Sequence, residues 1–560
     1  MNDPLKLSRF LVLWALAWAL TPAWAQPAFQ ASPQASLPQA SAPIATHEPA
    51  PADELRFDIL EIDVEGNSVL SPLEIERAVS PFLGPDRGFA DVESARKALE
   101  DAYQRVGYQT VFAEIPEQKI QNGVVRLHVI EGTVDRTNVV GARYFSLGDI
   151  RARAPDLMPG SVPDLLALQQ ELARLNRGSD RQVAPILKPG RTPGTVDVDL
   201  SVKDQFPLHG EFEADNRAAA FTRPLRLNAA LHYDNLWQRE HSLGLNFQTS
   251  PQDTRQVNVL YGTYLWKFQD RADVLSLYAV RSNSNIAIVG SSTVLGQARI
   301  AGTRWIHPFG SGASYFHSLT AGLDYKDFGQ TNISAQTGAP DTLPPIHYLP
   351  FSLGYSGTWS GALSQLQFTL TASSAPRGIL GNSDAAFAGR RVVASASYVT
   401  LKYDLSYDRR VGSHVDVYAK IDGQSTGDAL IPNEQFAGGG AESVRGYRES
   451  EILGDTGEHG SLEVRASPYA WNSAADGPFA YGFVFFDAAS VRTINPQGPQ
   501  LSTPTADISS CGLGVRASGW HGLRLDLDLG HALRDGALGV NGTITRRGMN
   551  RANFSMALSF

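Results

Sequence analysis

The second half of the chain consists of segments in which apolar and polar residues alternate. From about residue 206 to residue 560 these segments are roughly 10–14 residues long and have a period of two. The clearest is Leu523-Arg524-Leu525-Asp526-Leu527-Asp528-Leu529, and Val415 to Asp422 repeats the pattern. Successive side chains of a strand point to opposite faces, so each segment has an apolar and a polar face. About sixteen such segments, separated by Gly, Asn, Asp and Pro, predict a transmembrane antiparallel β-barrel over residues 204–560.

The last segment has the same alternation and is aromatic at its end. Phe554, Met556, Leu558 and Phe560 alternate with small residues, and the sequence stops at Phe560. An aromatic residue at the end of such a strand resembles the signal by which outer-membrane barrels are recognised for insertion. These four residues are the predicted insertion signal.

Two smaller units precede the barrel. Residues 56–133 show a strand over Phe57 to Val64, two helices with apolar residues at helical spacing, and strands over 108–115 and 124–130. Residues 134–203 repeat this β-α-α-β-β order. The predicted fold is therefore mainly β, with two small α+β domains ahead of a sixteen-stranded barrel.

The N-terminus predicts export. Lys6 and Arg9 precede an apolar run, and Ala23-Trp24-Ala25 fits a cleavage site between Ala25 and Gln26, so residues 1–25 are a predicted signal peptide. Residues 26–55 are rich in Ala and Pro and predict a flexible lead-in.

Composition excludes several classes of function. The net charge is −9 and the basic residues are scattered, so no nucleic-acid partner is expected. The chain has no Gly-x-Ser-x-Gly, no His-Glu-x-x-His and no phosphate-binding loop, so neither an enzyme nor a nucleotide-driven machine is expected. The 12 histidines are scattered without ligand spacing and Cys511 is the single cysteine; no metal, cofactor or disulfide is predicted.

Two motifs stand out within the barrel segments. Val444-Arg445-Gly446-Tyr447 follows the glycines at 438–440, in a long interruption between two alternating segments. Phe485-Phe486-Asp487 lies inside a later segment, where Phe485 and Asp487 share a face. A charge facing lipid is costly, so Asp487 is expected to face the lumen. Spacing alone leaves two interpretations open: an Arg445–Asp487 pair, or a solvated loop arginine and an ordinary lumen carboxylate.

The signal peptide, the two α+β units, the sixteen strands and these motifs together resemble the outer-membrane transporters of two-partner secretion, which export filamentous haemagglutinin and haemolysin-type proteins. The resemblance implies that the small units are POTRA domains, and the segment Asn176 to Val183 is similar to the end of the second one. It also implies that a loop around 428–456, after the eleventh or so strand, folds into the lumen and pairs Arg445 with Asp487. Breaking such a pair costs about 3–5 kcal/mol if it is buried, and much less if the lumen is wet.

The resemblance implies a function. An exoprotein, such as an adhesin or haemolysin, would be captured unfolded by the POTRA domains in the periplasm and passed through the barrel without nucleotide. Outer-membrane lipid and, during biogenesis, the barrel-assembly machinery are the other expected partners. The better-known members start with a plug helix, which the proline-rich lead-in does not favour. A barrel-assembly factor and a passive porin are the alternatives; the identity of the exoprotein, its binding residues and the oligomeric state are left open.

Overall fold

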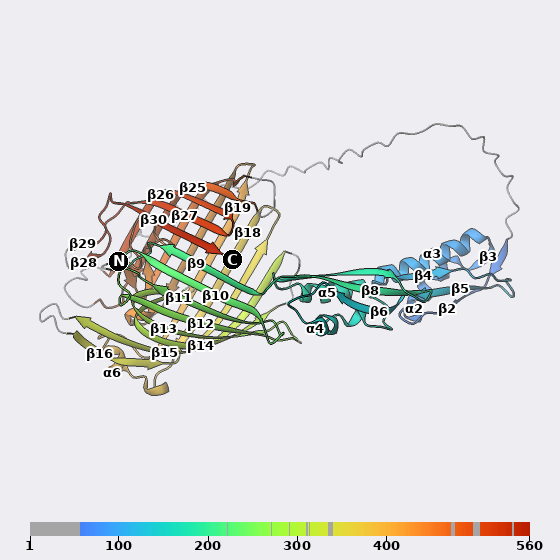
Figure 1. Cartoon of the computed structure of the whole chain (residues 1–560), viewed down its shortest axis with the longest axis horizontal. Helices are drawn as coiled ribbons and strands as arrows, with labels where there is room; N and C mark the ends of the chain where they lie inside the picture. Colours follow the sequence, from blue (N-terminus) through green and yellow to red (C-terminus); the bar gives the residue numbers. More distant parts are fainter. Residues whose placement is uncertain are drawn as a thin grey trace, which may run out of the picture.

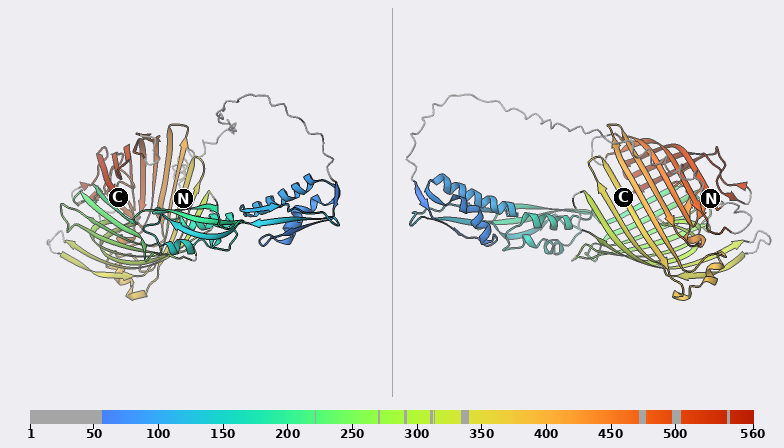
Figure 2. Two further views of the ribbon diagram at one scale, coloured as in Figure 1. Left: turned by 45° about the vertical axis from the view of Figure 1, so that its right-hand side comes forward. Right: turned by 180° about the vertical axis from the view of Figure 1, so that it is seen from behind.

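The computed structural model describes residues 56–560, except 221, 270, 290–291, 310–311, 313, 334–339, 472–476, 497–503 and 540–541. The predicted signal peptide with its Ala25–Gln26 cleavage site, and the lead-in 26–55, lie outside the described residues. Two small α+β units lie end to end and project from one end of a barrel (Figures 1 and 2).

The first unit is a three-stranded sheet covered by two helices. Strand β2 pairs in parallel with β5, and β4 pairs antiparallel with β5 on its other side. Ser71 and Glu74 form a capping box at the start of α2, and α3 ends at Gly107, whose φ is 119°. The elements are β1 Phe57–Ile59, β2 Glu61–Glu65, α2 Pro72–Val79, η1 Ser80–Phe82, β3 Gly84–Arg87, α3 Phe89–Val106, β4 Val111–Glu114 and β5 Val124–Glu131.

The prediction of one strand over Phe57 to Val64 is wrong. The chain forms two short strands there, because the backbone N–H groups of Leu60 and Glu61 both donate to the Gly123 carbonyl and interrupt the extended run. Strand β1 then pairs with β3, a short strand that no alternation predicts, while β2 enters the main sheet.

The second unit repeats the topology of the first. Strand β6 pairs in parallel with β8, and β7 pairs antiparallel with β8. Leu168 and Leu175 of α5 are buried against Val198 and Leu200 of β8, so one helical face closes the core. The elements are β6 Thr133–Val140, α4 Leu147–Ala152, η2 Pro155–Leu157, α5 Leu165–Leu175, β7 Arg181–Pro189 and β8 Thr195–Asp204.

The remaining strands form a closed antiparallel barrel in which β9 pairs with both β10 and β30. Two of its strands are interrupted, at Leu349-Pro350 and at Ser467-Pro468, so that β16 with β17 and β23 with β24 each make one strand. Proline cannot donate to the ladder, which accounts for the breaks. With each pair counted once, the described residues form the sixteen strands that the sequence predicts. The barrel strands are β9 Leu208–Asp215, β10 Arg226–Leu236, β11 His241–Thr249, β12 Val257–Lys267, β13 Val274–Val289, β14 Ser292–Pro308, β15 Tyr315–Ile333, β16 Pro340–Tyr348, β17 Phe351–Ser360, β18 Ser364–Ala375, β19 Tyr398–Val411, β20 Val415–Ser425, β23 Thr456–Ala466, β24 Tyr469–Ala470, β25 Phe479–Arg492, β26 Thr505–Trp520, β27 Leu523–Ala532 and β30 Asn550–Ser559.

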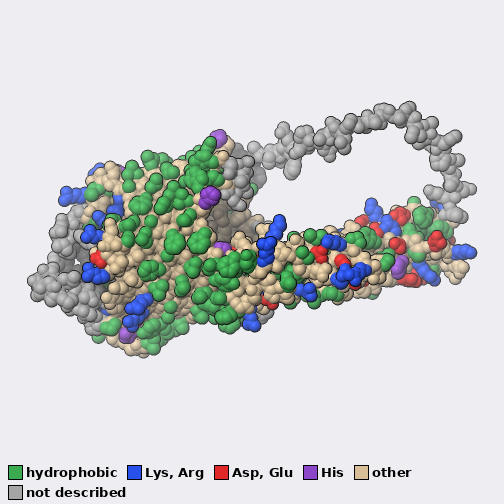
Figure 3. Space-filling model, in the orientation of Figure 1, with side chains coloured by type: hydrophobic (Ala, Val, Ile, Leu, Met, Phe, Trp, Pro, Cys, Tyr) green, Lys and Arg blue, Asp and Glu red, His purple; other side chains and the backbone are tan. Residues whose placement is uncertain are grey.

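The outer wall of the barrel is apolar. Leu527 and Leu529 are about half exposed, whereas Asp528 between them is buried on the inner side. Apolar side chains cover the outside of the barrel, and charged ones gather at its ends and on the α+β units (Figure 3). So large an exposed apolar band is the surface that a bilayer covers.

Among the described helices, none combines the length and the apolar character needed to cross a bilayer.

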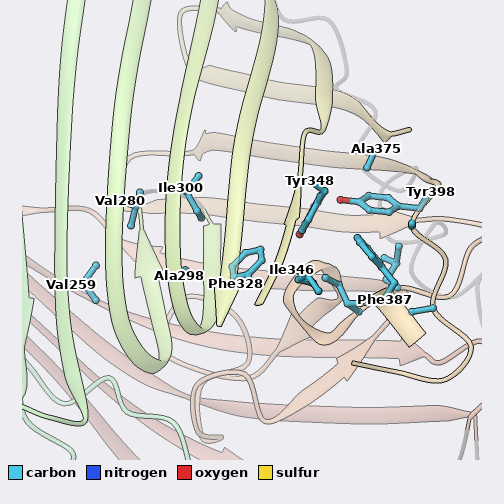
Figure 4. Close-up of a cluster of buried hydrophobic side chains, with 14 of the residues drawn as sticks. Val259, Val280, Ala298, Ile300, Phe328, Ile346, Tyr348, Ala375, Phe387 and Tyr398 are labelled. Atoms are coloured by element: carbon cyan, nitrogen blue, oxygen red, sulfur yellow. The ribbon is translucent and has the colours of Figure 1, made fainter. Parts of the chain in front are cut away.

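Three long loops lie at the barrel end far from the α+β units. The loop between β20 and β23 folds inward and carries η4 Pro432–Glu434, β21 Phe436–Gly438 and β22 Ile452–Gly454. The loop after β18 carries η3 Ile379–Gly381 and α6 Asp384–Ala388, and the loop after β27 carries β28 Leu538–Gly539 and β29 Gly542–Thr543. Phe387 of α6 packs with Tyr348 and Tyr398 in a buried cluster that also contains Leu430 of the inward loop (Figure 4).

Candidate functional site: an arginine anchor inside the barrel

The motif Val444 to Tyr447 lies at the tip of the inward loop, against the inner wall. Val444 and Tyr447 are fully buried with Ala489, Val491 and Ile508. The Tyr447 hydroxyl lies 3.0 Å from the Ser509 carbonyl oxygen and 2.7 Å from that of Arg534. These contacts hold the tip against strands β25 and β26.

Two glycines make this close approach fit. Gly446 has a φ of 105°, in the left-handed region where a side chain is strained. On the facing wall, a Cβ added to Gly530 would lie 2.6 Å from the Arg445 carbonyl carbon. The loop tip and strand β27 therefore touch backbone to backbone.

Arg445 makes a two-pronged ion pair with Asp487 on β25. Its Nε lies 2.8 Å from Asp487 Oδ2, and its Nη2 lies 2.8 Å from Asp487 Oδ1. The Arg445 backbone N–H also donates to Asp487 Oδ2, at 3.1 Å. The side chains are 5% and 0% exposed, so this is a buried pair and not one in a wet lumen.

Other side chains complete the surroundings of the guanidinium. Glu463 on β23 lies 2.6 Å from Nη1, and the Ser461 hydroxyl lies 3.1 Å from Nη2. The ring of Phe485 lies beneath the guanidinium, 3.7 Å from its central carbon to the ring centroid. Charge, hydrogen bonds and an aromatic face together satisfy the buried cation.

The predicted motif residues are brought together, and two neighbours were missed. Arg445 and Asp487 pair as the resemblance implies, and Phe485, predicted to share a face with Asp487, lies beneath the guanidinium. Glu463 and Ser461 were not predicted as part of the site. A signal for them exists in the sequence, because Ser461, Glu463 and Arg465 alternate with Leu462 and Val464 and so face the lumen together. The four residues predicted as an insertion signal lie elsewhere: Phe554, Met556 and Leu558 on the outer face of β30, and Phe560 directly after it. Each is at least 39% exposed, and their role stays a prediction.

This arrangement is an anchor. Arginine stays protonated in proteins, so it offers no proton for acid–base chemistry. The facing carboxylates are already engaged by the guanidinium, which leaves no free set of ligands for a metal. What the geometry does is fix the inward loop to one side of the barrel.

A second anchor lies near the base of the same loop. Asp455 is fully buried and lies 2.6 Å from Arg391 Nη1 of the loop after β18. Its carboxylate also accepts from the backbone N–H groups of Leu430, at 2.9 Å, and Ile494, at 2.7 Å. One carboxylate therefore joins three loops, and no sequence motif singles it out.

A third contact lies on another wall of the barrel. Glu434 of the inward loop is buried and accepts from Lys326 Nζ on β15, at 2.6 Å, and from the Tyr348 hydroxyl. The inward loop is thus tied at its tip, near its middle and at its base.

Two family models match the chain. Residues 57–132 match the POTRA domain, ShlB-type, and residues 194–517 match the haemolysin secretion/activation protein ShlB/FhaC/HecB.

Curated relatives include outer membrane transporters. The chain is 26% identical over 489 residues to the outer membrane transporter CdiB of Escherichia coli O6:K15:H31 (strain 536 / UPEC), covering 78% of this chain and 76% of that protein. It is 28% identical over 183 residues to another CdiB of Escherichia coli, where the match spans only 32% of this chain and 30% of the relative. It is 19% identical over 418 residues to the heme/hemopexin transporter protein HuxB of Haemophilus influenzae (strain 86-028NP), covering 72% of this chain and 71% of that protein.

Solved structures share the fold. CdiB from Escherichia coli has a TM-score of 0.61 at 18% identity, covering 92% of this chain and 93% of that one. BamA from Haemophilus ducreyi lacking POTRA domains 1–3 has a TM-score of 0.54 at 13% identity, covering 90% of this chain and all of that one. At these identities the likeness speaks for the fold alone, whereas the family model spans more than half of the sequence: the chain belongs to the haemolysin secretion/activation protein ShlB/FhaC/HecB family.

Proposed function

We propose that this outer-membrane transporter captures one unfolded secreted protein with two POTRA domains, residues 56–133 and 134–203, and passes it through the barrel to the cell surface. The observation that carries the proposal is the inward loop, which is fixed to the wall by Arg445 in a barrel that follows two sheet-forming domains. The relatives named above are transporters, and none of these features requires a reaction to be catalysed.

The loop leaves space against strands β9 to β12, to one side of its anchor. The partners of Arg445 come from β23 and β25, with Gly530 of β27 beside it. A cavity of about 320 Å³ lies between Glu442 and Glu449 of the loop and strands β9 to β12; Arg217, which follows β9, also lines it and pairs with Glu442 at 2.5 Å. A path for an extended chain along this side would leave the Arg445–Asp487 pair intact and would open the partly exposed Arg217–Glu442 pair.

Capture requires a sheet edge that can accept a strand. The β7 edge is a poor acceptor for an added strand. The Asn176 side chain already bonds the backbone N–H and C=O of Val183. Positions 185 and 189, whose backbone faces the same way, are prolines and have no N–H to donate. The β4 edge is covered in a similar way, since Arg96 and Glu100 bond the backbone of Ala113.

The opposite edge of the second sheet is the better acceptor. Strand β6 is the other edge of that sheet, and its first part is covered where Val134 pairs with Gly160 and Ser161. The following part, with Asn138 and Val140 exposed, would take the added strand. Main-chain hydrogen bonds do not depend on the side chains of the added strand, so this edge suits an unfolded substrate.

Crosslinking tests which edge is used. In a Cys511→Ser background, a cysteine at Asn138 on β6 or at Leu187 on β7 would carry a photoactivatable group in cells that export the protein. We expect adducts with the secreted protein from position 138 and few from position 187. Equal adducts, or adducts from 187 alone, would contradict capture at β6.

Secretion tests the transport function and the anchor. Deleting the gene should remove one large protein from the medium and leave the other outer-membrane proteins unchanged. The wild-type gene should restore secretion, whereas Arg445→Ala should restore it poorly. The substitution leaves the buried Asp487 carboxylate without its counter-charge, which costs about 3–5 kcal/mol. Arg445→Lys should also fail, because an ammonium cannot make the two-pronged pair.

The control is Arg524→Ala, which removes an arginine that is 47% exposed and whose nearest carboxylate oxygen is 3.7 Å away. It should secrete like wild type. A general fall in outer-membrane proteins after deletion would identify a barrel-assembly factor instead. If deletion changes neither the secreted proteins nor the outer-membrane proteins, a passive porin is the better hypothesis.

A further inference from the structure

Two histidines separated in the sequence meet at the joint between the second α+β unit and the barrel. Strands β9 and β10 pair antiparallel, and the register places His209 directly opposite His232. The two imidazole rings lie 4.9 Å apart with an angle of 31° between their planes. Asp234 follows His232 by two residues and so lies on the same face of β10.

The ring nitrogens converge on one carboxylate. His232 Nε2 lies 3.2 Å from Asp234 Oδ2, and His209 Nε2 lies 3.9 Å from the same oxygen. The three ligand atoms all lie within 4.8 Å of one another. Around a tetrahedral Zn²⁺, bonds of about 2.0–2.2 Å place ligand atoms roughly 3.3–3.5 Å apart. The longer of the two histidine–carboxylate separations is that between His209 and Asp234, and Asp234, whose side chain is 27% exposed, can close it by rotating.

A further carboxylate comes from the α+β unit, and it lies outside this group of three ligand atoms. Asp180 follows α5, its side chain is 6% exposed, and its Oδ1 lies 2.8 Å from His209 Nε2. Gln205 Nε2 donates to the same oxygen at 2.9 Å, and this contact orients the carboxylate.

We propose that His209, His232 and Asp234 bind one divalent transition-metal ion, with Zn²⁺ as the best fit, and that Asp180 turns in from its contact with His209 to serve as the fourth ligand. Two imidazoles with carboxylate oxygens suit Zn²⁺, whereas Mg²⁺ and Ca²⁺ favour ligand sets made of oxygen. Because Asp180 belongs to the α+β unit and the other three residues belong to the barrel, the bound ion ties the two together. Its role is structural: it fixes the angle at which the capturing unit meets the barrel.

An ordinary histidine–aspartate pair at the same barrel end provides a comparison. His307 Nδ1 lies 2.6 Å from Asp273 Oδ1, and Trp305 donates to the other oxygen of that carboxylate. Within the part of the chain that the structure describes, no second histidine or further carboxylate joins that pair in a ligand cluster, and the His209 group is the one such cluster.

Metal titration tests the site. The full chain, prepared in detergent micelles without a histidine tag, would be titrated with Zn²⁺ against a chelating dye. We expect one equivalent to bind to wild type and to His307→Asn. His209→Asn and His232→Asn should each weaken binding at least about tenfold. With Co²⁺ in place of Zn²⁺, wild type and His307→Asn should show the visible absorption of a tetrahedral complex, whereas His209→Asn and His232→Asn should not.

A second readout follows the joint itself. Zn²⁺ should slow backbone hydrogen exchange in β7 and β9 of wild type and of His307→Asn, but not of His232→Asn. A shift in gel mobility between unheated and heated samples would show that the barrel of each variant is folded. If a variant barrel is not folded, Asp234→Asn is tested in its place. Binding that is absent, that exceeds one equivalent without saturation, or that is equal in wild type and His232→Asn would overturn the proposal.

Discussion

Arg445 belongs to a row of alternating charges along the inner wall. Glu463 lies between Arg445 and Arg465, and Arg465 in turn pairs with Asp408 at 3.0 Å. Each buried charge therefore has an opposite charge beside it, which is the condition for burying it without a large penalty. A lysine would supply the charge but not the planar fork that engages Asp487 twice.

A buried glutamate in the second α+β unit predicts a pH dependence. Glu171 of α5 is 9% exposed, and its Oε2 has no hydrogen-bond partner. Burial and the nearby Asp156 charge raise the pKa of Glu171 from 4.5 to about 7. Because the folded-state pKa is raised, the folded unit holds more protons than the unfolded one between about pH 4.5 and pH 7, so its stability should fall as pH rises through this window.

Glu171→Gln should remove this fall and stabilise the unit at neutral pH by up to about 3 kcal/mol. Hydrogen exchange of the α5 amides in the full chain, corrected for intrinsic rates, measures the effect at both ends of the window. Glu76→Gln, at an exposed position of α2, is the matched control. A stability of α5 that does not vary with pH in wild type would contradict the prediction.

At the scale of elements, the inward loop is held more firmly than its sequence suggests. Only its tip carries a recognisable motif, yet Asp455 and Glu434 fasten its base and middle. Beyond the barrel wall, Asp455 ties it to the loops after β18 and β25. Tyr447 ties it to the loop after β27, and Glu442 ties it to Arg217 in the segment after β9. These loops should therefore respond together to a change in any one of them.

Asp455→Asn should loosen all three loops at once. It leaves Arg391, whose side chain is 12% exposed, without its counter-charge. We expect faster proteolysis in the loop after β18 and a larger single-channel conductance, while the barrel itself stays folded. Asp416→Asn, which removes the partner of the half-exposed Arg410 at the opposite barrel end, should change neither. Cleavage confined to the loop after β20 would show that the loops move independently.

Alternation in the sequence predicted the barrel strands well because each strand has one face in an apolar setting and one facing inward. It failed where backbone hydrogen bonds decide, as at Leu60, and it carries no information on how loops fold into the lumen. The Arg445–Asp487 pair was predictable only through the resemblance. Spacing alone did not choose between a buried pair and two solvated groups.

At the scale of the whole molecule, the histidine cluster at the joint depends on long-range register and could not be predicted from the sequence. His209 and His232 are scattered in the sequence and become neighbours only when β9 pairs with β10. Asp180 joins them only because the second α+β unit docks at that point. The same docking places Gln238 and Glu240 of the turn after β10 against Ser146, Arg153 and Arg181, so the joint is polar and specific.

The closure of the barrel has a consequence in chain entropy. Strands β9 and β30 are paired over five residues, from Ser555–Asp215 to Ser559–Glu211. Asn216 extends this seam by bonding the backbone of Ala552 and Phe554, the latter 338 residues away. Bringing such distant residues together costs roughly 3 kcal/mol more in loop entropy than closing a ten-residue loop. Among the described barrel strands, with each interrupted strand counted whole, the β9–β30 pairing is the shortest, and it must offset the largest loss of loop entropy. The two side-chain hydrogen bonds of Asn216 offset part of that loss.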